Sequence, residues 1–228
     1  MKLRVAPVLL AALASACVQL PLPEPVQRQA PADFPEAYYR QAQAQGKAVF
    51  RIDPAQSLLV VEVRRGGSLA RIGHDHVVAS HHLSGYVASD EGRADLYVPL
   101  ERLVVDEPGL RAESKFESQP TDSDIEGTRR NMLEKVLEAE QFPFALIRVR
   151  RSDSGAGRLD VAITLHGTTR ELKIPAEIEA NIREVAASGR LELKQTDFGI
   201  VPYSILGGAI QVQDLLTLRF RIRALRLE

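Results

Sequence analysis

The stretch Leu216–Ala224, LTLRFRIRA, alternates apolar and polar residues along its whole length. Successive side chains of an extended strand point to opposite faces, so residues two apart share a face. One face would carry only apolar side chains, and the other would carry Thr217 and three arginines. This period of two predicts a β-strand with one buried face and one solvated, cationic face. The predicted buried face comprises Leu216, Leu218, Phe220, Ile222 and Ala224.

Other segments share this pattern or have the composition of short strands. Leu159–Leu165 alternates in the same way, and Leu191–Lys194 does so more briefly. Turns rich in Gly, Asp or Asn separate the segments, which is typical of antiparallel all-β proteins. About eight such strands hide their edges most completely by closing on themselves, so we predict an all-β, antiparallel β-barrel. The remaining predicted strands are 58–64, 83–89, 94–99, 145–150 and 171–178.

One segment has helical periodicity. Thr128–Glu140, TRRNMLEKVLEAE, places its apolar residues on one side of a helix. Pro143 ends this helix, and Phe142 and Phe144 beside it are expected to pack against apolar surface. We predict a short helix across one opening of the barrel, with an apolar side that contacts either the core or a ligand. That side comprises Met132, Leu133, Val136 and Leu137.

The chain begins with a segment typical of a secretory signal peptide. Residues 1–16 carry two basic residues, an apolar run too short to span a bilayer, and then small residues. The sole cysteine, Cys17, follows and resembles the lipobox cysteine that is acylated in bacterial lipoproteins. We expect export and a lipid anchor at Cys17, the alternative being cleavage after Ala16 without lipidation. Val18 in place of an aspartate favours the outer membrane, by resemblance to lipoprotein sorting signals.

Residues 17–46 are predicted to form a tether after the lipidated cysteine. Five prolines fall between Pro21 and Pro35, and prolines at this density favour extended chain. Residues 35–45 fit one short helix, with proline at its start and Gly46 just beyond its end. The folded domain is therefore expected at 47–228. Because the chain has one cysteine, the core of this domain must stabilise it without an internal disulfide.

Composition and motifs argue against several classes of function. A net charge of −1 and 5% aromatic residues without tryptophan provide neither the positive field nor the stacking surface of a nucleic-acid-binding protein. The sequence has no G-x-S-x-G elbow, no Gly-rich phosphate loop and no H-E-x-x-H metal motif, and Cys17 is needed for lipidation. We therefore expect no enzyme, no cofactor and no nucleic-acid partner.

Four of the five histidines lie within RIGHDHVVASHH, residues Arg71–His82. If this stretch is extended, His74 and His76 share a face, as two ligands of a zinc or copper site would. A third ligand is not evident, because His82 lies too far along the strand and His166 belongs to another segment. We favour a polar part of the wall. The alternative is a metal- or haem-binding redox or stress protein that uses His74 and His76.

The domain resembles the YceI-like family from about Val49 to the C-terminus. The matching segments are FRIDPAQSLLVVEV (50–63), RRNMLEKVLEAEQFPFALIRV (129–149), LHGTTRELKIPA (165–176) and TDFGI (196–200), in the family's order and spacing. The resemblance implies a lipocalin-like barrel in the periplasm, with an elongated apolar cavity for a polyisoprenoid or isoprenoid quinone and no catalytic residues. The chain departs from the family at Gln56, where members often have a histidine, and in its expected lipid anchor.

These observations together predict an exported lipid-binding protein. An amphiphilic isoprenoid would lie in the apolar interior, with its polar head near the mouth, and the anchor would hold the protein on the periplasmic side of the envelope. The candidate cavity residues are Met132, Phe144, Ile163, Leu165, Phe198, Leu218, Phe220 and Ile222.

Overall fold

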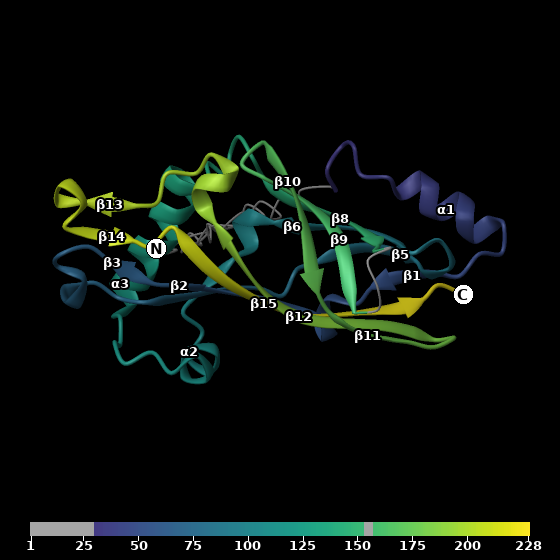
Figure 1. The fold of residues 1–228 in the computed structure, drawn as a ribbon, viewed down its shortest axis with the longest axis horizontal. Helices are drawn as coiled ribbons and strands as arrows, with labels where there is room; N and C mark the ends of the chain where they lie inside the picture. Colours follow the sequence, from purple (N-terminus) through teal and green to yellow (C-terminus); the bar gives the residue numbers. More distant parts are fainter. Residues whose placement is uncertain (1–29, 153–156) are drawn as a thin grey trace, which may run out of the picture.

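The computed structural model describes residues 30–152 and 157–228 (Figure 1). The predicted signal peptide, Cys17 and the first part of the predicted tether, through residue 29, lie outside these residues. The strands are β1 Val49–Ile52, β2 Leu58–Val63, β3 Arg65–Gly66, β4 His76–Ser80, β5 Ser84–Ala88, β6 Arg93–Pro99, β7 Val104–Val105, β8 Phe144–Arg151, β9 Arg158–Leu165, β10 Thr168–Pro175, β11 Glu177–Ala180, β12 Glu184–Lys194, β13 Ser204–Ile205, β14 Ile210–Val212 and β15 Leu215–Arg226. The α-helices are α1 Glu36–Ala44, α2 Pro108–Ser114 and α3 Asp122–Asn131.

One large antiparallel sheet forms most of the molecule, which confirms the predicted antiparallel all-β class. Its strands follow the order β10-β9-β8-β6-β5-β1-β15-β2-β4-β7, and β12 pairs with the other edge of β15 and carries β11. A small sheet, β13-β14-β3, lies at one end of the molecule (Figure 1). Figure 1 also shows β8, β9 and β10 crossing the direction of β12 and β15, so the large sheet is strongly twisted.

The ladders of the described residues do not close this sheet into a barrel. Strand β10 is bonded to β9, whereas β11, which begins after Ala176, is bonded to β12. The chain therefore passes from one arm of the sheet to the other between Pro175 and Glu177. The two arms come close there, because a Cβ added to Gly189 of β12 would lie 2.7 Å from the carbonyl oxygen of Pro175.

Strand β15 is the centre of the sheet. It pairs with β12 along its length, with β2 over Thr217–Arg221 and with β1 over Ala224–Arg226. Because β1 is the first strand and β15 the last, the two ends of the folded chain are bonded side by side. The predicted alternation of LTLRFRIRA is realised, since Leu218 pairs with Leu191 and Val61, and the arginines take the opposite face.

The N-terminal helix α1 packs on the outside of the sheet (Figure 1). Tyr39 is fully buried, and its hydroxyl donates a hydrogen bond of 2.6 Å to Asp95 of β6. Phe34, before the helix, packs edge-on against Tyr97 at 4.9 Å between ring centroids. The predicted helix at 35–45 is confirmed, but the boundary at residue 47 left out part of the folded unit, because aromatic residues fix this segment to the sheet.

The predicted helix at 128–140 begins earlier and ends earlier. Helix α3 starts after Thr121, whose side chain caps the backbone of Asp124 while the Asp124 carboxylate bonds back to Thr121. This capping box satisfies two of the free N–H groups at a helix N-terminus. A π-helical turn, Met132–Val136, continues α3, and the chain then leads through Pro143 into β8.

Helix α2 covers the face of β2 and β4 that points away from the large sheet's interior (Figure 1). A compact set of side chains lies beneath it, and we call this set, with Asp106 and Arg111 beside it, the packed flank. Its apolar members are Val60, Val77, Ala79, Leu110 and Phe116, all buried. Neither this helix nor the packing below it was predicted from the sequence.

Candidate functional site

The curved sheet encloses a cavity of about 750 Å³. Inward-facing residues of many strands line it, as the alternation predicts, and they are almost entirely aliphatic. Strand β15 contributes five of them, Leu216, Leu218, Phe220, Ile222 and Ala224. Strands β2, β6, β8, β9 and β12 contribute Leu59, Val61, Val63, Ala94, Leu96, Val98, Ala145, Ile147, Val149, Leu159, Val161, Ile163, Leu165, Val185, Ala187, Leu191 and Leu193. This volume falls within the range of small-molecule pockets, about 300–1,000 Å³.

Six of the eight residues predicted for the cavity line it. They are Met132, Ile163, Leu165, Leu218, Phe220 and Ile222. Phe144 does not, because Ala145, the next residue on β8, points inward, so Phe144 points outward and packs edge-on against Tyr97. Phe198 is buried in a core cluster with Leu193 and Ile200 and does not reach the lining.

Phe220 owes its position to a glycine on the neighbouring strand. It pairs with Gly189 of β12, and a Cβ added to Gly189 would lie 2.7 Å from the ring of Phe220. The absence of a side chain at Gly189 lets the ring lie across β12 on the cavity wall. The π-helical turn faces this wall, where Met132, Val136 and Leu137 line the cavity, and Met132 and Leu137 also pack against the main core.

Polar side chains gather at the end of the cavity near β3 and α3. His76 lies on β4, two residues before the inward-facing Val78, and His74 lies beside it with ring centroids 6.1 Å apart. The Nε2 of His76 lies 3.4 Å from the hydroxyl of Thr128 on α3. The Nδ1 of His74 is buried and has no hydrogen-bond partner among the described residues. The other polar residues at this end are Arg65, Asp124, Asn131, Gln195, Tyr203 and Gln211.

A buried carboxylate fixes the ring of His76. Asp106 lies 2.6 Å from Nδ1 of His76, accepts a 2.9 Å bond from the backbone N–H of Val77, and accepts a 2.5 Å bond from Arg111. Burial acts to raise the pKa of Asp106, but its bonds with His76, Val77 and Arg111 together hold that pKa below its ordinary value. Asp106 is therefore ionised at neutral pH, and it orients His76 so that Nε2 faces the cavity.

The side chains of Asp106, His76 and Thr128 follow one another in space as carboxylate, imidazole and hydroxyl. This is the order of groups in a catalytic triad. The 3.4 Å between His76 and Thr128 is longer than a strong hydrogen bond, however. Residues 30–152 and 157–228 contain no group of three His, Cys, Asp or Glu side chains placed to hold a metal ion. The arrangement is suited to hydrogen bonding with a polar group in the cavity, and the metal alternative for His74 and His76 lacks a third ligand here.

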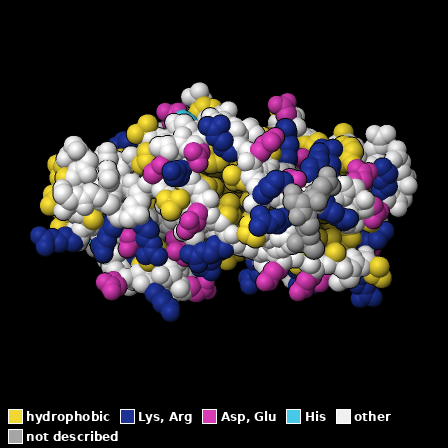
Figure 2. All heavy atoms as spheres, viewed as in Figure 1, with side chains coloured by type: hydrophobic (Ala, Val, Ile, Leu, Met, Phe, Trp, Pro, Cys, Tyr) yellow, Lys and Arg dark blue, Asp and Glu magenta, His cyan; other side chains and the backbone are white. Residues whose placement is uncertain are grey.

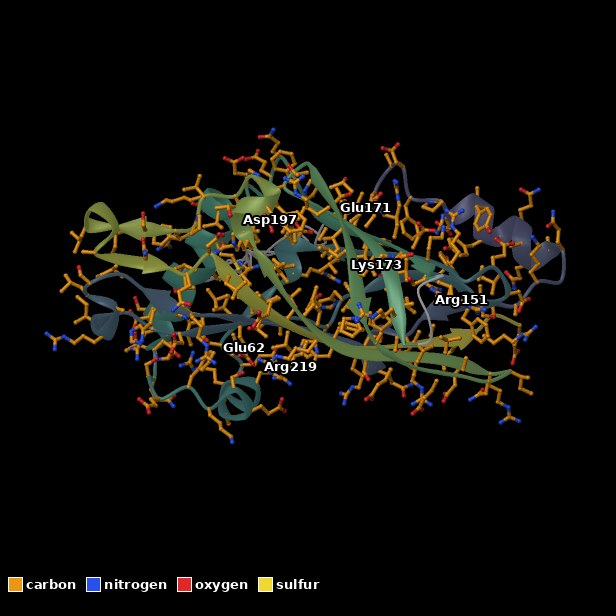
Figure 3. All side chains as sticks on the ribbon, in the orientation of Figure 1. Glu62, Arg151, Glu171, Lys173, Asp197 and Arg219 are labelled. Carbon is orange, nitrogen blue, oxygen red and sulfur yellow. The ribbon has the colours of Figure 1, made fainter. Side chains whose placement is uncertain are left out.

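Two of the three arginines on the outer face of β15 are paired with acidic side chains. Arg219 binds Glu113 of α2 at 2.6 Å, and Arg223 binds Glu184. Figure 3 shows Arg219 near Glu62. It also shows Lys173 on β10, and the Lys173 side chain binds Asp160 at 2.7 Å. The cationic stripe predicted from LTLRFRIRA is thus neutralised at Arg219 and Arg223, and Arg221 is exposed.

A family model described as the YceI-like domain matches residues 50–224. The chain belongs to the YceI-like family. Its YceI-like domain is similar to a polyisoprenoid binding domain from Saccharophagus degradans implicated in plant cell wall breakdown, with 12% identity and a TM-score of 0.56 over 79% of this chain and 99% of that one. It is also similar to Burkholderia cenocepacia BcnA, with 13% identity and a TM-score of 0.50 over 75% of this chain and 98% of that one. At these identities the likeness shows the fold, and no match was found among curated proteins.

Sequence reasoning missed the residues that position the histidines of this YceI-like domain. Asp106 and Thr128 lie 30 and 52 residues from His76 along the chain, so no local spacing indicates the contact. The capping box at Thr121 and Asp124 was visible in the sequence and would have placed the start of α3, and with it Thr128, correctly. Within the described residues, no helix is long and apolar enough to cross a membrane.

Proposed function

We propose that this protein binds an amphiphilic isoprenoid, a polyisoprenoid or an isoprenoid quinone, in the cavity of its curved sheet. The observation that carries the proposal is the 750 Å³ cavity with a continuous aliphatic wall. Withdrawing hydrocarbon from water stabilises a complex by about 25 cal/mol per Å² of apolar surface, so a long chain with many methyl branches gains most from such a wall. The similarity to a polyisoprenoid binding domain supports this choice of ligand.

The polar head of the ligand would lie at the end of the cavity that holds His74 and His76. Because Asp106 accepts from Nδ1 of His76, the neutral imidazole presents Nε2 as an acceptor toward the cavity. A hydroxyl group on the ligand could donate to this nitrogen. The unpartnered Nδ1 of His74 adds a second hydrogen-bonding position beside it. The hydrocarbon would then extend along the aliphatic wall.

We further propose that the two arms of the sheet act together as a barrel-like container on the periplasmic side of the cell envelope. Export would depend on residues 1–16, and acylation of Cys17 would anchor the protein, by our interpretation in the outer membrane. The protein would hold or carry its ligand without a cofactor and without a catalytic step. The side chains at the polar end would orient the ligand.

Native mass spectrometry of the protein purified from its own membranes tests the proposal, with organic extraction and elemental analysis of the same sample. We expect a discrete isoprenoid mass at near-stoichiometric occupancy and no stoichiometric metal. Stoichiometric zinc, copper or iron without an isoprenoid would overturn the proposal and make His74 and His76 a metal site.

Two neighbouring alanines of β12 provide a matched control. Ala187 lines the cavity, whereas Ala186, the preceding residue, faces outward. We expect Ala187→Trp to displace the isoprenoid by filling the cavity, and Ala186→Trp to retain it. Equal occupancy in both variants would show that the lipid is bound elsewhere.

A further inference from the structure

Four large apolar side chains are exposed together at the end of the molecule that carries β13 and β14, and we call them the apolar tip. They are Leu69 and Ile72, just before and at the end of a short 3-10 turn, and Ile205 and Leu206, at the turn between β13 and β14. Ile72 and Leu206 are 62% and 69% exposed. Figure 2 shows apolar side chains at this end.

The two loops of the apolar tip are joined through their backbones. The backbone N–H of Leu69 donates a 2.8 Å bond to the carbonyl of Ala209, and β14 pairs with both β13 and β3. Gly67 has a positive φ of 89°, and a Cβ there would lie 2.4 Å from the carbonyl oxygen of Ala209. The loops are therefore in direct backbone contact.

Leu206 has a backbone conformation that is unfavourable for leucine. Its φ is 52°, in the left-handed region, which glycine or asparagine adopts readily and leucine rarely does. The strained backbone and the exposed apolar side chain both cost free energy. Such strain in a folded protein points to a role for the residue outside the fold.

The apolar tip is continuous with the cavity. Ile72 and Ile205 line the cavity and are also exposed, so this end of the cavity reaches the surface between them. His74 and His76 follow Ile72 directly along the chain. An isoprenoid that leaves a bilayer at the tip would reach the aliphatic wall without exposing its hydrocarbon to water.

An exposed arginine lies beside the apolar tip. Of the three arginines in residues 64–73, Arg64 and Arg65 pair with Asp75, and residues 201–213 contain no charged residue. Arg71 is exposed and has no ion-pair partner in the part of the chain that the structure describes. At the far end, where Ile178 lines the cavity and Ile182 is exposed, residues 177–184 carry three glutamates and one arginine, and Arg93 and Arg151 also line the cavity.

We propose that the apolar tip inserts into the surface of a lipid bilayer that contains anionic phospholipid, and that the cavity exchanges its ligand there. The proposal rests on the proposed function, because it takes the membrane as the source of the ligand. Leu206 and Ile72 would enter the boundary between head groups and acyl chains, as apolar residues of peripheral proteins do. Arg71 would contact the lipid phosphates.

The absence of tryptophan from the chain allows a direct test on the full-length protein. Leu206→Trp places a single fluorophore at the apolar tip, and Ile182→Trp places one at the far end as a matched control, since Ile182 is 77% exposed. Each variant is mixed with phosphatidylcholine vesicles, with and without phosphatidylglycerol, that contain brominated acyl chains. We expect emission from Leu206→Trp to shift to shorter wavelength and to be quenched, and emission from Ile182→Trp to stay unchanged.

Two further variants test the chemistry of insertion with an Ile72→Trp probe. Arg71→Glu should raise the phosphatidylglycerol-vesicle concentration needed for half-maximal quenching by at least about fivefold. Leu206→Asn should raise it about tenfold by removing the apolar side chain. Because asparagine tolerates a positive φ, Leu206→Asn should leave the thermal midpoint equal or higher, so its effect cannot be attributed to misfolding.

The outcomes separate this proposal from the proposed function. Absence of quenching from Leu206→Trp, or equal quenching at both ends, overturns docking by the tip even if an isoprenoid is extracted from the cavity. A blue shift that depends on protein concentration without lipid overturns it in favour of contact between two copies. Quenching at the tip with no isoprenoid in the extract would support docking and would exclude an isoprenoid as the ligand.

Discussion

The two faces of β4 show how the same strand serves different purposes. Val77 and Ala79 point toward α2 and are each 1% exposed, in the packed flank. His76 and Val78 point the other way and border the cavity. One face is filled with side chains, with a buried ion pair at its edge, and the other leaves room for a ligand.

This difference between the two faces indicates which residues stabilise the folded state. Residues that line the cavity are mostly half-buried, because they have neighbours on one side only. Residues of the packed flank are surrounded by neighbours and lose more contacts when truncated. We infer that the flank and the docked helix α1 stabilise the protein, while the cavity wall determines ligand binding. Each prediction below tests this division.

The largest contrast is expected between two phenylalanines. Phe116→Ala in the packed flank should cost about 4 kcal/mol of unfolding free energy, since it empties a buried site. It also removes the ring under Arg64, whose guanidinium lies 4.3 Å from the ring centroid. Phe220→Ala on the cavity wall should cost about 1–2 kcal/mol, because its ring is only partly buried. Urea denaturation of both variants measures the difference.

Ligand binding should reverse this order. Phe220→Ala is expected to change isoprenoid occupancy, and Phe116→Ala to leave it unchanged in the folded fraction. Equal destabilisation by the two substitutions would break the proposed division between flank and wall.

Asp106→Asn should cost about 3 kcal/mol, because it leaves Arg111 buried without an ionised partner. Asparagine accepts the positive φ of 59° at this position, so the backbone is preserved. The lowered pKa of Asp106 means that its contribution is fully present above its unfolded pKa, about 4, and is lost as the pH falls through the lower folded pKa. Urea denaturation between neutral and acidic pH should show a loss of stability in this range that is smaller in Asp106→Asn.

Tyr39→Phe should cost about 2 kcal/mol, the range for a buried hydrogen bond to a charged group. Burial, followed by the bond to Asp95, holds the pKa of Tyr39 above its ordinary range, so its hydroxyl remains a donor. Thermal denaturation monitors the loss, with Tyr38→Phe as a control on the same helix. A change below about 0.5 kcal/mol would show that α1 contributes little to the folded unit.

His76→Gln should have the smallest effect on stability, below about 1 kcal/mol, because glutamine can still bond to Asp106. Its effect on ligand binding should be larger, since Nε2 of His76 is lost from the cavity. His81→Gln is the matched control, because His81 bonds to Glu107 outside the cavity. Occupancy by native mass spectrometry checks the pair, and equal occupancy would exclude His76 from ligand contact.

Much of the cavity wall could be predicted from the sequence, because a period of two assigns a face to every residue of a strand. Ile163, Leu165, Leu218, Phe220 and Ile222 were identified in this way. Phe144 was predicted from its place beside Pro143, and alternation along β8 turns it outward because Ala145 points into the cavity. An assignment that is wrong by one residue places a side chain on the opposite face.

The packed flank and the polar end could not be predicted in the same way. Asp106 meets His76 and Arg111 only after β4, β7 and α2 have come together, and none of these short elements has a strong periodic pattern. Closure of the sheet also depends on how two arms approach in space, which the strand patterns do not specify. The family resemblance suggested a barrel, but the ladders show only a curved, antiparallel sheet.

The pairing of β1 with β15 has a consequence for how the chain comes to be folded. Phe50 is bonded opposite Arg226, so the central ladder cannot form until β15 is available. Contacts this distant along the chain slow folding, since the loop between them must be closed before the contact stabilises it. The central sheet of a nascent chain therefore stays incomplete until β15 has been synthesised. Such delayed folding would keep the nascent chain unfolded, which is the state that the proposed export requires.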